Sequence, residues 1–429
     1  MAHAHNRRSR RSLLQDAGGL ACALACATLL AACAGTAPPD LTTQAAPQVP
    51  TDTAGLDKRR MVKVALLVPL SAQGHAGLIG KSLKQAGELA LFERDSPSLQ
   101  LIVKDDKGTP EGAKAAAEEA IKGGATLILG PLFAKSVPAV SQVARPANVA
   151  VVTFSNDRQV AGNGIYLLSF QPAPEVVRVV AYAAQQGKRR FAALTPEDAF
   201  GRIAAASFRE AVGRAGGTVV ASESYPVSAN GVLEPLRRVS AVIQAAEAAG
   251  APVDALFVPG GQENLEIIAR LLPQADIDTD KVKLIGTGGM DYPNVGRDAK
   301  LVGAWYPGPD PRGWNDFAQK FAKSYGQAPP RIAGLAYDAV SLAIALSGGA
   351  DEQRYTAATL TRAGGFTGID GTYRLLPDGT TSRALAILEV QKFGVAVIDA
   401  PSGVSASPSP AAPAVTGATS TLLNIFNLN

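Results

Sequence analysis

Short apolar runs and longer amphipathic stretches alternate along most of the chain. The apolar runs are rich in β-branched residues, which predicts strands at 62–68, 99–104, 125–129, 149–154, 191–194, 218–221, 255–258 and 283–285. The Ala-rich stretches between most of them predict helices at 78–93, 111–122, 136–145, 175–186, 203–214, 233–248 and 263–272. Strands that are apolar on both faces and alternate with helices form parallel sheets covered on both sides. The sequence therefore predicts an α/β fold with doubly wound parallel sheets.

Two sheets fit this pattern better than one closed barrel. The alternation seen over 62–154 is repeated in kind over 191–285, and the segment 166–172 between them is typical of a crossing strand. The pattern then changes, with helices predicted at 314–325, 332–346 and 355–363, and antiparallel strands at 371–375 and 384–391. We expect the turn Pro377-Asp378-Gly379 to join those two strands.

The first 32 residues have the pattern of an export signal. A basic segment, 7–11, precedes an apolar run that is too short and too rich in Ala and Gly for a membrane span. The run ends Leu-Ala-Ala-Cys, which resembles the bacterial lipobox, so we expect cleavage before Cys33 and a diacylglycerol on its thiol. The alternative is an ordinary signal peptide with an incidental cysteine. Arg10-Arg11 leaves both Sec and twin-arginine export open.

A lipid on Cys33 would fasten the protein to a membrane. Ala34, which follows it, favours sorting to the outer membrane, so the expected location is lipid-anchored and facing the periplasm. Residues 33–61 are rich in Pro, Thr, Ala and Gln and should form a flexible tether. Residues 397–429, rich in Pro, Ala and Ser over much of their length, should form a disordered tail.

Composition excludes several classes of function. The 429 residues carry 41 Lys+Arg and 37 Asp+Glu, and four of those arginines lie in the leader. The rest is nearly neutral, which argues against a nucleic-acid partner. After the leader, Cys33 and His75 are the only Cys and His, so we expect no disulfide framework, no metal and no cofactor.

Catalytic motifs fail for similar reasons. Gly80-Lys81-Ser82 has the end of a phosphate-binding loop, but position 75, where that loop needs glycine, is His75. The chain contains no Gly-x-Ser-x-Gly motif for a serine nucleophile. We therefore expect a protein that is not an enzyme.

Short motifs follow one another in a fixed order between residues 62 and 396. They are 62–71 with Gly74, Asp105-Asp106, Leu129-Gly130-Pro131-Leu132, 153–156, Phe200-Gly201 and Tyr337-Asp338. This series resembles the type I periplasmic binding proteins, the leucine/isoleucine/valine-binding class. The resemblance implies one lobe from 62–171 with 307–367 and another from 172–306 with 368–396. It also implies crossings near Gln171, Tyr306 and Gly368, and a ligand cleft at the carboxyl ends of the strands, as is general for open α/β sheets.

The same resemblance implies the residues that line the cleft. After the first strand these are Ser71 and Gly74; after the third, Phe133, Ala134 and Ser136; after the fourth, Thr153, Ser155 and Asn156; in the second lobe, Phe200 and Asp291. Hydroxyls and N–H groups would hold a carboxylate, and Asp291 would hold an ammonium. The set is incomplete for a free amino acid. Ser155 and Asn156 could equally be strand-end caps, Phe200 a core aromatic and Asp291 a turn residue.

Within this class, several short sequence segments are most similar to those of a lipoprotein branch, the penicillin-binding-protein activators. The lipobox, Leu-Leu-Val-Pro-Leu-Ser, Leu-Ile-Leu-Gly-Pro-Leu-Phe-Ala and Val-Thr-Phe-Ser-Asn-Asp carry that similarity. It implies an outer-membrane regulator that activates a penicillin-binding protein in peptidoglycan synthesis. The alternative is a lipid-anchored receptor that delivers branched-chain or related amino acids to an ABC transporter. The expected partners are thus the membrane, a peptidoglycan synthase and an amino-acid-like ligand.

Overall fold

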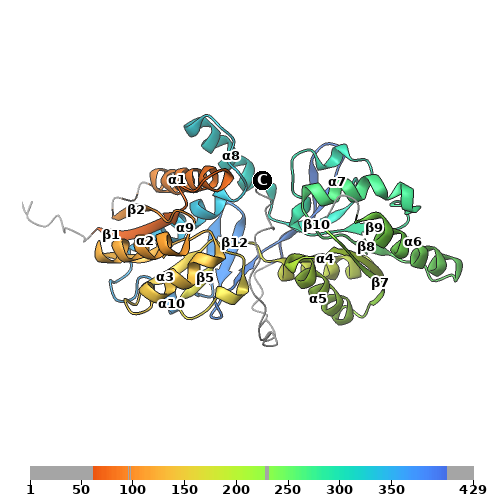
Figure 1. Cartoon of the computed structure of the whole chain (residues 1–429), viewed down its shortest axis with the longest axis horizontal. Coiled ribbons are helices and arrows are strands. Elements are labelled where there is room, and N and C mark those ends of the chain that lie inside the picture. Colours follow the sequence, from red (N-terminus) through yellow and green to blue (C-terminus); the bar gives the residue numbers. More distant parts are fainter. Residues whose placement is uncertain (1–60, 95, 97, 228–230, 403–429) are drawn as a thin grey trace, which may run out of the picture. The chain divides into compact units, whose positions relative to one another are not determined.

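A computed structural model describes residues 61–94, 96, 98–227 and 231–402. The signal peptide, Cys33, the tether up to residue 60 and the tail beyond residue 402 lie outside the described residues. The described part contains two large, mainly parallel sheets with helices on both faces of each (Figure 1). The predicted fold class is confirmed.

The first sheet has five parallel strands in the order β2-β1-β3-β4-β5. Their bounds are Leu99–Asp105, Val62–Val68, Ala125–Leu129, Ala150–Thr153 and Ile165–Leu167. Side chains that alternate along β1 face opposite sides, so Val64 and Leu66 lie in one core and Ala65 and Leu67 in the other. Because both sides are buried, the strand is apolar at every position from Val64 to Val68.

Different helices cover the two faces of this sheet. One core contains residues of α1 (His75–Glu93), α8 (Pro311–Tyr325) and α9 (Ala333–Ser347). The other contains residues of α2 (Pro110–Lys122) and α3 (Val137–Ala144). Although α1 and α9 are far apart in the sequence, they lie side by side (Figure 1). The first lobe is therefore completed by a late part of the chain.

The second sheet has seven strands in the order β15-β14-β10-β9-β8-β6-β7. Their bounds, in that order, are Val395–Asp399, Ala386–Val390, Trp305–Gly308, Lys283–Ile285, Ala255–Phe257, Arg190–Pro196 and Thr218–Tyr225. The pairings are parallel from β10 to β7, and β14 and β15 are antiparallel additions. One face packs against α4 (Pro172–Gln185) and α5 (Ala199–Arg214), the other against α6 (Leu233–Ala248) and α7 (Gln262–Leu271).

A small antiparallel sheet corrects the predicted end of the first lobe. It consists of β11 (Phe366–Gly368), β12 (Gly371–Leu375) and β13 (Thr381–Arg383). We expected the strand at 371–375 to pair with one at 384–391, but β12 pairs with β13, a strand absent from the prediction, and β14 pairs with β10. Tyr373 and Leu375 belong to the core of the first lobe. Residues 368–383 therefore do not belong to the second lobe.

The third crossing consequently lies later than Gly368. Ala384 donates its N–H to Thr372 O in the small sheet, whereas Leu385 O accepts from Arg178 in α4 of the second lobe. The chain thus changes lobe between Ala384 and Leu385. The other two crossings lie at 168–172 and 308–311.

Two further boundaries differ from the prediction. Strand β15 extends to Asp399, so the tail does not begin at residue 397. The helix expected at 355–363 is shorter, since α10 covers Ala357–Leu360. Single 3-10 turns, η1 to η5, fill connections at Ala134–Ser136, Arg158–Val160, Pro273–Ala275, Gly288–Met290 and Val295–Arg297.

Candidate functional site

Loops at the carboxyl ends of β1, β2 and β3 contact one another. The backbone N–H groups of Ser71 and Lys107 both donate to Oδ1 of Asp105, at 3.2 and 2.9 Å. Burial acts to raise the pKa of Asp105, but these hydrogen bonds outweigh it and lower the pKa below its ordinary value. A Cβ on Gly108 would lie only 3.1 Å from the Phe133 ring, which shows how closely the loops after β2 and β3 approach.

Gly74 and Asp106 complete this group. Gly74 stands immediately before α1 with φ +64°, a backbone conformation that glycine adopts without strain. Asp106 is fully buried, and its Oδ1 accepts from Gly108 N at 2.8 Å. Burial raises the pKa of Asp106 to about 6. Three of the motifs that we singled out in the sequence thus lie at one edge of the first sheet.

Two polar residues at the end of β4, Thr153 and Ser155, make hydrogen bonds within the protein. Thr153 Oγ1 donates to Pro131 O at 2.7 Å and accepts from Ser155 N at 3.2 Å. Ser155 Oγ accepts from Asp157 N at 3.1 Å, and Ser155 O accepts from Ser169 Oγ at 2.9 Å. The predicted donors Thr153 and Ser155 therefore hold the loop itself.

The remaining candidates of the first lobe differ in exposure. Ala134 and Ser136 form the single turn η1, and Ser136 is fully buried, with no partner for its Oγ among the described residues. Phe133 packs against the first core, and Lys135 Nζ lies 5.7 Å from its ring centroid. Asn156 is half-buried. Of these candidates, Phe133, Ala134 and Asn156 are partly accessible.

Phe200 lies in the first turn of α5, in the second lobe. Asp198 caps that helix by accepting from Gly201 N at 2.6 Å, which fixes where the helix begins. Phe200 is half-buried and belongs to neither core of the second lobe. The ring is therefore not the core aromatic that we considered as its alternative role.

Asp291, the predicted ammonium partner, is already paired with a cation of the other lobe. It follows η4, and its Oδ1 accepts from Tyr306 Oη at 3.4 Å. Its Oδ2 lies 3.8 Å from Arg331 Nε. Burial raises the pKa of Asp291, and the Arg331 guanidinium acts against this rise. An incoming ammonium would have to compete with a fixed guanidinium.

Arg331 itself is held rigidly. Its two terminal nitrogens bind both oxygens of Asp370, at 2.9 and 2.5 Å, in the bidentate geometry that arginine and carboxylate favour. Its guanidinium carbon lies 4.3 Å from the ring centroid of Trp314 and 5.6 Å from that of Phe170. Sequence reasoning missed this residue, because nothing in the loop before α9 marks it.

A second buried pair lies beside it. Asp338 is fully buried, accepts from Ile369 N at 2.8 Å, and has Oδ2 3.8 Å from a nitrogen of Arg383, which is 4% exposed at its side chain. Burial raises the pKa of Asp338 to about 7, and Arg383 opposes the rise. The Arg383 guanidinium also lies over the Phe170 ring, with its Cζ 4.6 Å from the ring centroid. The only sequence signal for this pair was a lone aspartate in an otherwise apolar helix.

Glu175 is a further acid that the sequence did not single out. It lies in the first turn of α4 and accepts from Gly288 N at 2.9 Å. Burial raises its pKa to about 7, helped by the nearby Asp291 charge.

Among the described residues no group of three His, Cys, Asp or Glu could hold a metal ion. No described helix is long and apolar enough to cross a membrane.

Two sheet-based lobes, three crossings and polar loops at the strand ends define the class of the type I periplasmic binding proteins. The comparisons with known proteins agree. The family model described as "Periplasmic binding protein" matches residues 61–394. The chain belongs to this family, and the resemblance read from the sequence is confirmed at this level.

Solved structures share the fold at low identity. A putative branched-chain amino acid ABC transporter protein from Rhodospirillum rubrum has a TM-score of 0.68 and 19% identity, covering 79% of this chain and 99% of that one. A leucine-binding protein from Thermotoga maritima has a TM-score of 0.55 and 17% identity, covering 80% of this chain and 99% of that one. A solute-binding protein from Rhodopseudomonas palustris, in complex with 3,4-dihydroxybenzoic acid, has a TM-score of 0.55 and 21% identity. The match covers 80% of this chain and 99% of that one.

One curated relative is similar in sequence. It is an uncharacterised protein of Rickettsia prowazekii, 21% identical over 237 residues, which are 54% of this chain and 62% of that protein. The match thus spans less than two thirds of the relative's length.

Proposed function

We propose that this protein is a lipid-anchored, non-enzymatic regulator that activates a penicillin-binding protein in peptidoglycan synthesis by contact. One observation carries the proposal. The side chain expected to hold the ammonium of an amino acid, Asp291, is paired with Arg331 of the other lobe. A binding-protein fold that satisfies its own ligand-binding groups is suited to recognising another protein.

The donors for a ligand carboxylate support the same interpretation. The Thr153 hydroxyl and the Ser155 backbone N–H bind each other, and Ser136 is buried. A carboxylate placed there would have to break these bonds, and a buried charge without partners costs several kcal/mol. Binding of a partner protein to the outer surfaces of the lobes would not carry this cost. We therefore assign recognition to those surfaces.

The test of this proposal is a reaction with purified components. The protein, without its lipid, is added to purified peptidoglycan synthases of the same cell with lipid II as substrate, and glycan polymerisation and peptide crosslinking are measured. We expect at least a several-fold stimulation of one synthase. No stimulation of any synthase in the set would refute the proposal.

A second function is favoured by the structural relatives. Several of them are named as solute- or substrate-binding proteins of ABC transporters, and two of these are described in complex with 3,4-dihydroxybenzoic acid or benzoate, ligands without an ammonium group. The second candidate is thus a lipid-anchored receptor for a small solute. Calorimetry with amino acids and benzoates separates the two candidates, since micromolar binding would favour the receptor.

Anchoring and location are part of the proposal. The Leu-Ala-Ala-Cys sequence supports a lipid on Cys33, and Ala34 supports an outer-membrane site facing the periplasm. A synthase of the inner membrane would then be contacted across the periplasm, over the expected tether of residues 33–61, which when fully extended would reach at most roughly 95 to 105 Å.

A further inference from the structure

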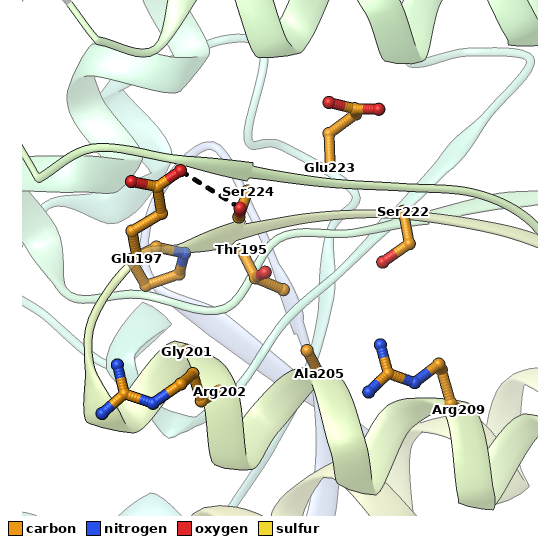
Figure 2. Close-up of a pocket in the computed structure, with 10 residues that line it drawn as sticks. Thr195, Glu197, Gly201, Arg202, Ala205, Arg209, Ser222, Glu223 and Ser224 are labelled. Carbon is orange, nitrogen blue, oxygen red and sulfur yellow. Dashed lines mark hydrogen bonds between the residues drawn. The ribbon is translucent and has the colours of Figure 1, made fainter.

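A groove of about 520 Å³ lies in the second lobe between α5 and the edge of the sheet (Figure 2). It exists because small side chains stand where large apolar ones would fill the space. Thr195 on β6, Ser222 and Ser224 on β7, and Gly201 and Ala205 on α5 line it. One turn further along α5, large aromatic packing closes the interface between helix and sheet. The groove thus lies over the carboxyl-terminal ends of β6 and β7.

Two arginines on the same side of α5 border this groove. Arg202 and Arg209 are two turns apart, which places their Cα atoms about 10 Å apart along the helix. Both side chains are exposed, and in the described part of the chain neither guanidinium has an acidic partner. Figure 2 shows both on the helix that faces Ser222 and Ser224.

Carboxylates near the groove do not cancel this charge. Glu223 points to the other face of the sheet and pairs with Arg238 of α6 at 2.7 Å. Glu197 is exposed at the end of β6 and accepts from Ser224 Oγ at 3.2 Å. Among the described residues that line the groove, two guanidiniums without an acidic partner thus face one unpaired carboxylate, that of Glu197. The groove therefore favours an anionic occupant.

The strand that borders the groove has an open edge. Within the described residues, β7 ends the seven-stranded sheet. Tyr225 O accepts from Glu197 N at 2.8 Å, so the backbone of Tyr225 faces β6. Because backbone groups alternate in direction along a strand, Ser224 and Ser222 turn their N–H and C=O groups outward. The strand also has no Lys or Pro, the residues that usually protect an edge.

We propose that this surface binds an extended acidic segment of a partner protein, which adds to β7 as a further strand. Its backbone would pair with Ser222 and Ser224, and carboxylates on one of its faces would bind Arg202 and Arg209. Side chains on one face of a strand recur every roughly 6.8 Å, so two such carboxylates lie within reach of both guanidiniums. This inference rests on the groove and edge alone and does not depend on the regulator role.

Fluorescence anisotropy with a labelled nine-residue peptide of alternating Glu and Val tests the proposal on the full periplasmic chain. We expect saturable binding that weakens at least tenfold in the double variant Arg202→Glu/Arg209→Glu. Ser222→Pro, which removes one outward N–H but no bond to β6, should weaken binding several-fold. Arg270→Glu is the matched control, because Arg270 is an exposed arginine on α7 of the same lobe. Circular dichroism confirms that each variant is folded.

Two altered peptides separate the parts of the proposal. A peptide with Gln in place of Glu should bind at least tenfold more weakly. A peptide with an N-methyl group on every peptide bond, which blocks the N–H groups of both its edges, should not bind. Equal binding of the Gln peptide would refute the acidic preference. Equal binding of the N-methylated peptide would refute strand addition, and no binding of the parent peptide would overturn the whole proposal.

Discussion

Asp291 and Arg331 form an ion pair between the two lobes, with 3.8 Å between Oδ2 and Nε. Arg331 reaches this position from the loop before α9, held by both oxygens of Asp370. Asp291 comes from the turn after β9, where it also accepts from Tyr306. The contact means that the acid best placed to recognise an ammonium group faces a guanidinium of the protein.

The first prediction concerns amino-acid binding. Isothermal titration with leucine, isoleucine, valine and the other standard amino acids should give no dissociation constant below about 1 mM, because Asp291 is already compensated. Asp291→Ala should leave this result unchanged, as should the control Glu118→Ala on an exposed face of α2. Micromolar binding of an amino acid that is lost in Asp291→Ala would favour the receptor instead.

The second prediction concerns the buried pair Asp338 and Arg383. Asp338→Ala should lower the free energy of unfolding by about 3 to 5 kcal/mol at pH 8, because it leaves a buried guanidinium without its carboxylate. The double variant Asp338→Leu/Arg383→Met should cost less than the single one. Urea unfolding measures both.

An exposed pair provides the control for this experiment. Glu234 and Arg237 on α6 are more than half exposed at their side chains, so Glu234→Ala should cost less than about 1 kcal/mol. If the double variant at 338 and 383 is the less stable one, the two charges are not acting as a buried pair.

The third prediction is a pH dependence from Glu175. Its pKa rises from 4.5 to about 7 on folding, so the folded state holds the proton more tightly than the unfolded state. This contribution to stability is complete below pH 4.5 and is lost as the pH rises to 7. The loss lowers the free energy of unfolding by at most about 3 kcal/mol. Glu175→Gln should therefore be more stable than the wild type at pH 8, with a flatter profile between pH 5 and 7.

Thermal unfolding across this pH range measures the effect. The exposed Glu118→Gln serves as the control and should keep the wild-type profile. A Glu175→Gln profile parallel to that of the wild type would show that Glu175 does not titrate in this range.

The fourth prediction concerns the lipid anchor. Cys33→Ser should move the protein from the membrane fraction to the soluble periplasmic fraction, because the thiol that would carry the diacylglycerol is gone. Cys22→Ser within the leader is the matched control and should leave the protein in membranes. Membrane residence of the Cys33→Ser variant would contradict lipidation at this position.

Most of the fold could be predicted because its strands are buried on both faces. β1, β3 and β9 have the predicted bounds, and so does α6, since each is a continuous apolar run or a regular amphipathic stretch. β13 escaped prediction because Thr381-Ser382-Arg383 has no apolar residue. Thr381 is held by a hydrogen bond to Leu167 O, and Arg383 is buried on aromatic rings and near Asp338, contacts that local sequence does not reveal.

The candidate site could be predicted only in part. Ser71, Gly74 and Phe133 do gather at one edge of the first sheet, since the ends of parallel strands meet there. The partners that decide their chemistry could not be found. Arg331 is 40 residues from Asp291 and in the other lobe, and Ser155 is satisfied by its own loop. Such pairings depend on tertiary packing and leave no periodic signal.

The regulator proposal is tested most directly by crosslinking in intact cells. A photoreactive amino acid is placed at exposed positions of both lobes, and the captured proteins are identified by mass spectrometry. We expect a penicillin-binding protein to be captured, and its yield to fall when the protein is released from the membrane by Cys33→Ser. Capture of an ABC permease with no peptidoglycan synthase would contradict the account and support a solute receptor.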